Sequence, residues 1–108
     1  MRVIVFCKEY LLASAIESLL TGEGDLISLN FTKNKSDLNN NILNFNPNVI
    51  ITDDESIPDV KFEFAELLRA QIGLKILVVN KEQNLVNLFV CQKIPITRSG
   101  DLLQAIYS

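Results

Sequence analysis

The chain lacks histidine altogether. Without an imidazole there is no Ser-His or Cys-His nucleophile pair, and the usual general base is missing. The only cysteines, Cys7 and Cys91, lie far apart among apolar neighbours, and their spacing does not suit a zinc site. We therefore expect free, buried thiols in a reducing cytosol, with no bound metal or other cofactor and no enzymatic activity.

The chain also has no marked excess of one charge and no long apolar run. The net charge is −3, and acidic and basic residues are interspersed, so nothing favours binding of nucleic acid or anionic membrane along the whole chain. The N-terminal apolar run, Val3–Phe6, is followed by charge and is too short for a signal peptide. We expect a soluble, cytoplasmic protein that does not contact a membrane.

What the chain does have is enough apolar residues for one core. It contains 108 residues, of which 48% are hydrophobic. A chain of this length forms one domain and buries about two-thirds of its unfolded surface.

The most informative stretch is Pro47–Asp54, a short apolar run that ends in the adjacent carboxylates Asp53 and Asp54. Such a run, opened by proline and rich in β-branched residues, is typical of a buried central strand. Open α/β sheets place their functional groups at the carboxyl ends of the strands. A functional site, if present, is therefore expected at Asp53 and Asp54.

Strand and helix patterns alternate along the chain. Alternation of this kind indicates a parallel sheet with helices on both faces. The predicted strands are 2–7, 25–31, the Pro47–Asp54 stretch and 74–79, and the predicted helices are 11–20, one carrying Leu38, Ile42 and Phe45 with Ser36 or Asp37 as its cap, 62–70 after a loop at 55–59, and a last helix at 101–107.

The region between Asn80 and Ser99 allows two interpretations. One is a helix at 84–92 followed by a short strand at 94–97, and the other is an eroded helix at 82–87 followed by a strand at 88–93. Val90, the alternating pattern and Pro95 favour the second.

Three stretches of the sequence resemble the receiver domain of two-component response regulators. Arg2–Leu20 is similar to the opening of that domain, and Pro47–Asp53 falls at the family's spacing for the third strand and its phosphoacceptor aspartate. Lys93–Thr97 is similar to the lysine-proline loop after the fifth strand, with one inserted residue. The resemblance covers essentially the whole chain.

This resemblance implies a receiver-like, flavodoxin-like fold for residues 1–108. The expected architecture is α/β and doubly wound, with five parallel strands in the order 2-1-3-4-5 and a fourth helix that is short or missing. The chain is then interpreted as one receiver-like domain, and as the N-terminal part of a longer regulator.

The resemblance also implies a phosphorylation pocket, from which this sequence departs. Asp53 stands at the phosphoacceptor position, with Asp54 as the alternative because the loop to Pro58 is one residue longer than in the family. Cys7 and Lys8 replace the acidic pair that holds magnesium in the family, and a thiol and an ammonium group cannot supply the oxygen ligands that Mg²⁺ requires.

Other pocket positions also differ from the family. Glu9 follows Lys8, Asn80 replaces a switching hydroxyl residue, and Lys93 matches the phosphate-sensing lysine. We expect Lys8 to form an ion pair with Asp53 or Asp54 in place of the metal, because a cation replaces a metal platform at this site.

These departures predict an atypical receiver, or pseudo-receiver, rather than a phosphorylated one. Its function would be a phosphorylation-independent regulatory and protein-interaction module, in transcription control, with DNA reached only through a separate output domain. It would bind a protein partner or form a homodimer through the apolar residues of the last helix, Leu102, Leu103, Ile106 and Tyr107.

Two other functions stay open at this stage. The first is a working receiver in which a histidine kinase phosphorylates Asp53 with the help of magnesium. The second is a small-ligand binder that uses the crevice at the carboxyl ends of the first and third strands.

Overall fold

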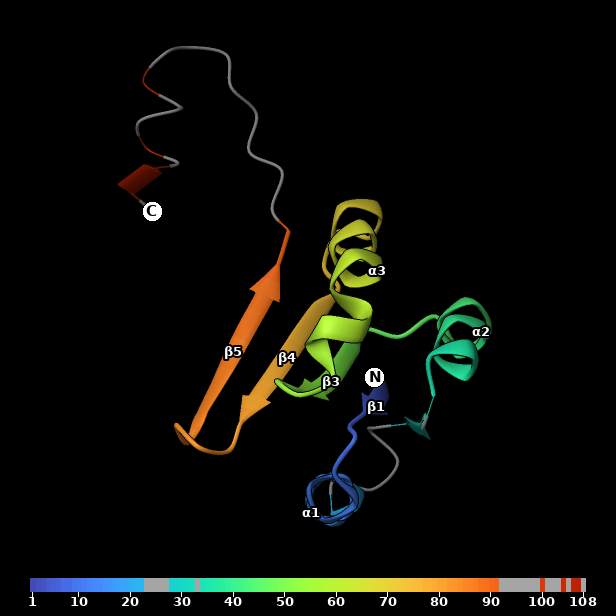
Figure 1. Ribbon diagram of the computed structural model, residues 1–108. Helices are drawn as coiled ribbons and strands as arrows, with labels where there is room; N and C mark the ends of the chain where they lie inside the picture. The colour runs from blue at the N-terminus through green and yellow to red at the C-terminus, as the bar shows by residue number, and fades with distance from the viewer. Residues whose placement is uncertain (23–27, 33, 92–99, 101–103, 105, 108) are drawn as a thin grey trace.

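A computed structural model describes residues 1–22, 28–32, 34–91, 100, 104, 106 and 107 of the chain (Figure 1). Its described elements are β1 (Arg2–Phe6), α1 (Tyr10–Thr21), β2 (Ser28–Phe31), α2 (Lys35–Phe45), β3 (Val49–Asp53), α3 (Ile57–Ala70), β4 (Lys75–Asn80) and β5 (Leu85–Val90). The five strands form one sheet in the order β2-β1-β3-β4-β5, as predicted. The chain is therefore an α/β protein with a mostly parallel sheet in a flavodoxin-like arrangement.

The sheet has two apolar faces because alternate residues of each strand point in opposite directions. On one face, Ile16 and Leu20 of α1 pack against the valines and isoleucines of β1 and β3. On the other face, α2 and α3 cover the main core, whose buried members are Ile4, Phe6, Leu38, Ile42, Ile50, Val60, Phe64, Leu74, Ile76 and Val78. Every residue of β3 is buried, which confirms the predicted central strand.

The prediction of a fully parallel sheet is wrong for the fifth strand. β1 pairs in parallel with β2 and β3, and β3 with β4, but β5 runs antiparallel to β4. The register places Asn80 opposite Leu85 and Lys75 opposite Val90. A parallel neighbour needs a long crossover, whereas the chain between these two strands is only the turn at 81–84.

Neither predicted helix, 84–92 or 82–87, forms after β4. The Asn80 side chain accepts the Gln83 N–H at 3.0 Å, and the Asn84 N–H donates to the Lys81 carbonyl at 3.3 Å. Asn84 adopts a left-handed conformation with φ of 58°, which asparagine tolerates and which a helix excludes. The favoured strand at 88–93 shares 88–90 with β5, and the 94–97 strand lies outside the described residues.

Two helices begin at other residues than the sequence predicts. α3 starts at Ile57 rather than Phe62, with Pro58 in its first turn, where the missing N–H has no cost. The segment predicted as a loop at 55–59 thus becomes partly helical. The cap of α2 is Asn34, whose side chain accepts the Asp37 N–H at 2.9 Å, rather than Ser36 or Asp37.

The last predicted helix is described only in part. Gln104, Ile106 and Tyr107 are helical, and the side chains of Ile106 and Tyr107 are exposed. Leu102 and Leu103 lie outside the described residues, so the predicted dimer surface stays a prediction. Among the helices that the structure describes, none has the length and apolarity needed to cross a bilayer.

The hairpin makes a testable prediction at Asn84. In its left-handed conformation, Asn84→Gly should be about 1 kcal/mol more stable than Asn84→Ala. In a helix the order would reverse, because alanine is preferred over glycine there by about 1 kcal/mol. Urea unfolding of the two variants measures the sign, and a more stable alanine variant would contradict the hairpin.

Candidate functional site

The candidate site lies where β1 and β3 end side by side. Phe6, the last residue of β1, is paired with Thr52, the last but one residue of β3, and the buried Thr52 hydroxyl donates to the Phe6 carbonyl at 2.6 Å. The loops that follow, Cys7–Glu9 and Asp54–Ser56, therefore start next to each other, with Asp53 at the end of β3 between them. This juxtaposition brings together residues more than 40 positions apart in the chain.

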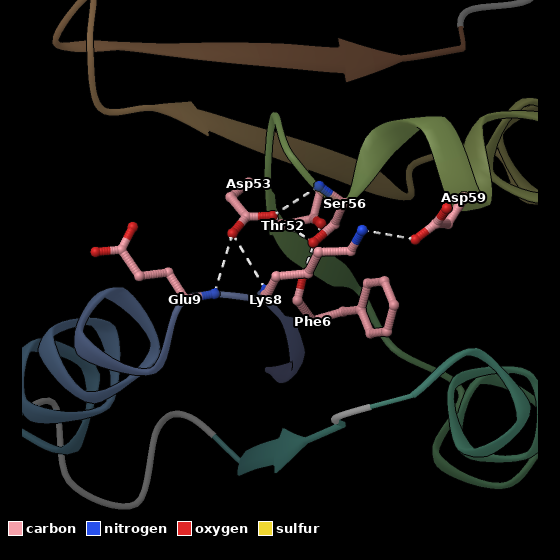
Figure 2. Close-up of polar contacts among 7 residues, drawn as sticks. All are labelled: Phe6, Lys8, Glu9, Thr52, Asp53, Ser56 and Asp59. Atoms are coloured by element: carbon pink, nitrogen blue, oxygen red, sulfur yellow. Dashed lines mark hydrogen bonds and ion pairs between the residues drawn. The ribbon is translucent and has the colours of Figure 1, made fainter.

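Asp53 joins these two loops through its carboxylate (Figure 2). Its Oδ2 accepts the backbone N–H of Lys8 at 3.1 Å and that of Glu9 at 3.5 Å. Its Oδ1 accepts the Ser56 backbone N–H at 3.0 Å and also the Ser56 hydroxyl. We call this set of contacts the Asp53 clasp.

The Asp53 clasp is buried as well as fully bonded. The Asp53 residue is 3% exposed and Ser56 is 0% exposed. Hydrogen bonds to an ionised carboxylate are about twice as strong as those between neutral groups. Both oxygens of Asp53 are thus committed to internal donors.

Asp54 has a different environment from its neighbour. It is exposed, and its backbone N–H donates to the Val79 carbonyl at 3.2 Å. Asp53 is the last residue of β3, so the strand does not slip to place Asp54 at its buried end. Of the two adjacent carboxylates, only Asp53 points into the gap between the loops.

The predicted ion pair between Lys8 and Asp53 or Asp54 is wrong. The Lys8 ammonium Nζ lies 2.9 Å from Oδ2 of Asp59, and both side chains are about half exposed. Figure 2 shows the Lys8 side chain turned away from Asp53 toward α3. The sequence interpretation placed Asp59 in a loop, whereas the early start of α3 puts it in the first helical turn, within reach of Lys8.

This exposed ion pair shifts the titration of both partners. The hydrogen bond and the charge of Asp59 raise the pKa of Lys8, and those of Lys8 lower the pKa of Asp59. The contribution of Asp59 to stability is therefore present above its unfolded pKa and is lost as the pH falls through its folded pKa.

Glu9 and the hairpin form the outer wall of the site. The Glu9 carboxylate points away from Asp53 in Figure 2 and pairs with the ammonium group of Lys81. Together with Asp53, Asp54, Glu55 and Glu82, these two residues line a cavity of about 150 Å³. Within the described ranges, no group of three or more Asp, Glu, Cys or His side chains is arranged to hold a metal ion.

The residues at this edge do not fit the magnesium site that the receiver resemblance implies. Cys7 and Lys8 offer a thiol and an ammonium group, Glu9 is engaged by Lys81, and the oxygens of Asp53 already accept four internal donors. Hard oxygen ligands in octahedral array are what Mg²⁺ requires.

Cys7 and Cys91 are free thiols, as predicted, but both are only partly buried, and Cys7 lies beside the clasp. Burial, with the negative charges of Asp53 and Glu9, raises the pKa of the Cys7 thiol to about 12. Since the thiolate is the reactive species, Cys7 is inert near neutral pH.

Cys7 also lines a cavity of about 650 Å³. This cavity lies between α1 and the ends of β1 and β2, whereas the small-ligand hypothesis placed its crevice at the ends of the first and third strands.

The remaining predicted pocket residues do not join the clasp. Asn80 uses its side chain to close the turn at 81–84, which makes it a turn residue. Lys93 lies outside the described residues, so its role as a phosphate-sensing lysine stays a prediction.

Two residues of the site were missed from the sequence. Ser56 stands three residues after Asp53, a spacing at which an Asp side chain commonly accepts local backbone N–H groups. Lys81 gave no comparable signal, because its pairing with Glu9 depends on the hairpin that returns β5 to β4.

The Asp53 clasp predicts that Asp53→Asn destabilises the fold by roughly 2 kcal/mol, because an amide NH₂ would face donors that now meet a carboxylate oxygen. Asp54→Asn is the matched control and should change the free energy of unfolding by less than about 0.5 kcal/mol. Urea unfolding at neutral pH measures both. Equal effects of the two substitutions would contradict the clasp.

The ion pair of Lys8 predicts an effect on Asp59 rather than on Asp53. Replacing Lys8 by Met should raise the pKa of Asp59 toward its ordinary value, because its largest source of stabilisation is lost. Carboxyl carbon chemical shifts followed over a pH titration measure this. Lys81→Met is the control, and it should leave Asp59 unchanged because Lys81 pairs with Glu9.

We compared the chain with models of protein families, with curated proteins and with solved structures. None of the three comparisons gave a match. The resemblance to receiver domains is therefore carried by the sequence pattern and by the order of the strands alone.

Proposed function

We propose that this chain is an atypical receiver-like domain, a regulatory and protein-interaction module that works without phosphorylation of Asp53. The observation that carries this proposal is the Asp53 clasp. A carboxylate that is buried and accepts four internal donors is a structural element of the loops.

Phosphoryl transfer to Asp53 would work against this geometry. The reaction depends on positioning and on neutralising the charge of the phosphoryl oxygens. A carboxylate oxygen of Asp53 would first have to give up its hydrogen bonds in order to attack. The ammonium groups of Lys8 and Lys81 are already paired, with Asp59 and Glu9 respectively. The site lacks both an accessible nucleophile and a free cation among these residues.

The clasp instead gives the carboxyl edge of the sheet a fixed shape. It connects the loop after β1 with the loop after β3, and Glu9 and Lys81 extend the connection to the hairpin. A surface whose loops are already ordered binds a partner with less entropy loss. We propose a protein partner, in keeping with the acidic character of this edge, and DNA contact only through a separate output domain in transcription control.

Acetyl phosphate or beryllofluoride with magnesium tests the proposal. Intact mass and tyrosine fluorescence should show neither an adduct nor a spectral shift on the full chain, while an authentic receiver treated in parallel shows both. A magnesium-dependent phosphoryl adduct mapped to Asp53 would overturn the proposal and favour the working-receiver alternative, with a histidine kinase as the donor.

A further inference from the structure

The most exposed apolar segment among the described strands is β5. Its six residues, Leu85–Val90, are all exposed, and five of them are large apolar residues with exposed fractions of 41–59%. Figure 1 shows β5 at the edge of the sheet, beyond the part that α3 covers. A sheet edge of this kind is a template for another strand.

The chemistry of β5 restricts what can cover it. The strand contains no charged residue, and Asn87 is its only polar one. Among the described strands, β4 is the one neighbour of β5 in the sheet, so the outer edge of β5 offers backbone N–H and C=O groups to an extended segment. The occupant is therefore an uncharged, apolar strand.

A second copy of β5 meets these requirements. We propose that two copies of this chain pair antiparallel through β5, about a two-fold axis perpendicular to the sheet, to form one continuous sheet. This symmetry keeps each face of one copy on the same side as that face of the other. The register with β4 shows that Val86 and Leu88 lie on the face of Val79 and Leu77, so their apolar stripe continues into the partner's.

Antiparallel self-pairing is also favoured because β5 carries no charged side chain. Like charges opposite each other destabilise paired strands, and β5 brings none. The other edge strand, β2, is shorter, and its Asn30 already accepts the side chains of Thr32 and Asn41. Of the two edges, β5 is the one suited to a second copy.

The pairing is expected to be weak. A standard interface buries about 800 Å² on each partner, which one added pair of six-residue strands does not reach. Dimerisation should thus appear at protein concentrations of about 0.1 to 1 mM. This inference goes beyond the proposed function, and it does not depend on the state of Asp53.

Sedimentation velocity over that concentration range tests the proposal. Wild type should shift from monomer to dimer, and Leu88→Lys should weaken dimerisation at least tenfold, because two ammonium groups would meet near the two-fold axis. Leu43→Lys is the matched control, since Leu43 is an 82% exposed leucine of α2, a helix that Figure 1 shows well apart from β5. If L88K fails to fold by circular dichroism, V86K replaces it.

Hydrogen exchange gives a second readout that points to the strand itself. Amides of β5 should exchange more slowly as the concentration rises, whereas amides of β2 should not change. A wild-type chain that stays monomeric to 1 mM would overturn the proposal. So would a dimer that L88K and V86K leave intact, which would place the interface elsewhere, for example at Ile106 and Tyr107 of the last helix.

Discussion

One carboxylate holds the carboxyl edge of this sheet together. Asp53 ends the buried strand β3, and from there it accepts the N–H groups of Lys8 and Glu9 and both donors of Ser56. These contacts fix the loops after β1 and β3 against each other because one carboxylate satisfies backbone donors of both. The same contacts occupy both oxygens of the carboxylate, and the Asp53 residue is 3% exposed.

The hairpin after β4 has consequences at both of its ends. At the turn it delivers Lys81 to Glu9, which completes the wall of the clasp. Along β5 it replaces the crossover helix of a fully parallel sheet with a direct antiparallel return. The strand is therefore left with exposed apolar side chains on both faces and at the edge of the described sheet, so the reversal of one strand explains both the closed site and the exposed strand.

Much of the fold was predictable from local patterns. The run from Val49 to Thr52 is apolar and β-branched enough to require burial on both faces, and the strand order followed from the alternation and the receiver resemblance. The fifth strand was predicted to run parallel to the fourth, whereas it runs antiparallel. The prediction failed because residues 82–92 carry mixed helix and strand signals. Periodicity does not reveal that Asn84 takes a left-handed conformation and closes a turn.

The sequence by itself determined an α/β core and placed Asp53 at the end of its central strand, because hydrophobic periodicity is a local property of the chain. It could not determine the partners of that carboxylate. The ammonium group of Lys8 meets Asp59 rather than Asp53, since the start of α3 and the register of β1 with β3 set the distances between groups far apart in the chain. Only the tertiary structure decided that Asp53 is bound by backbone donors and that β5 lies exposed, because both depend on long-range contacts.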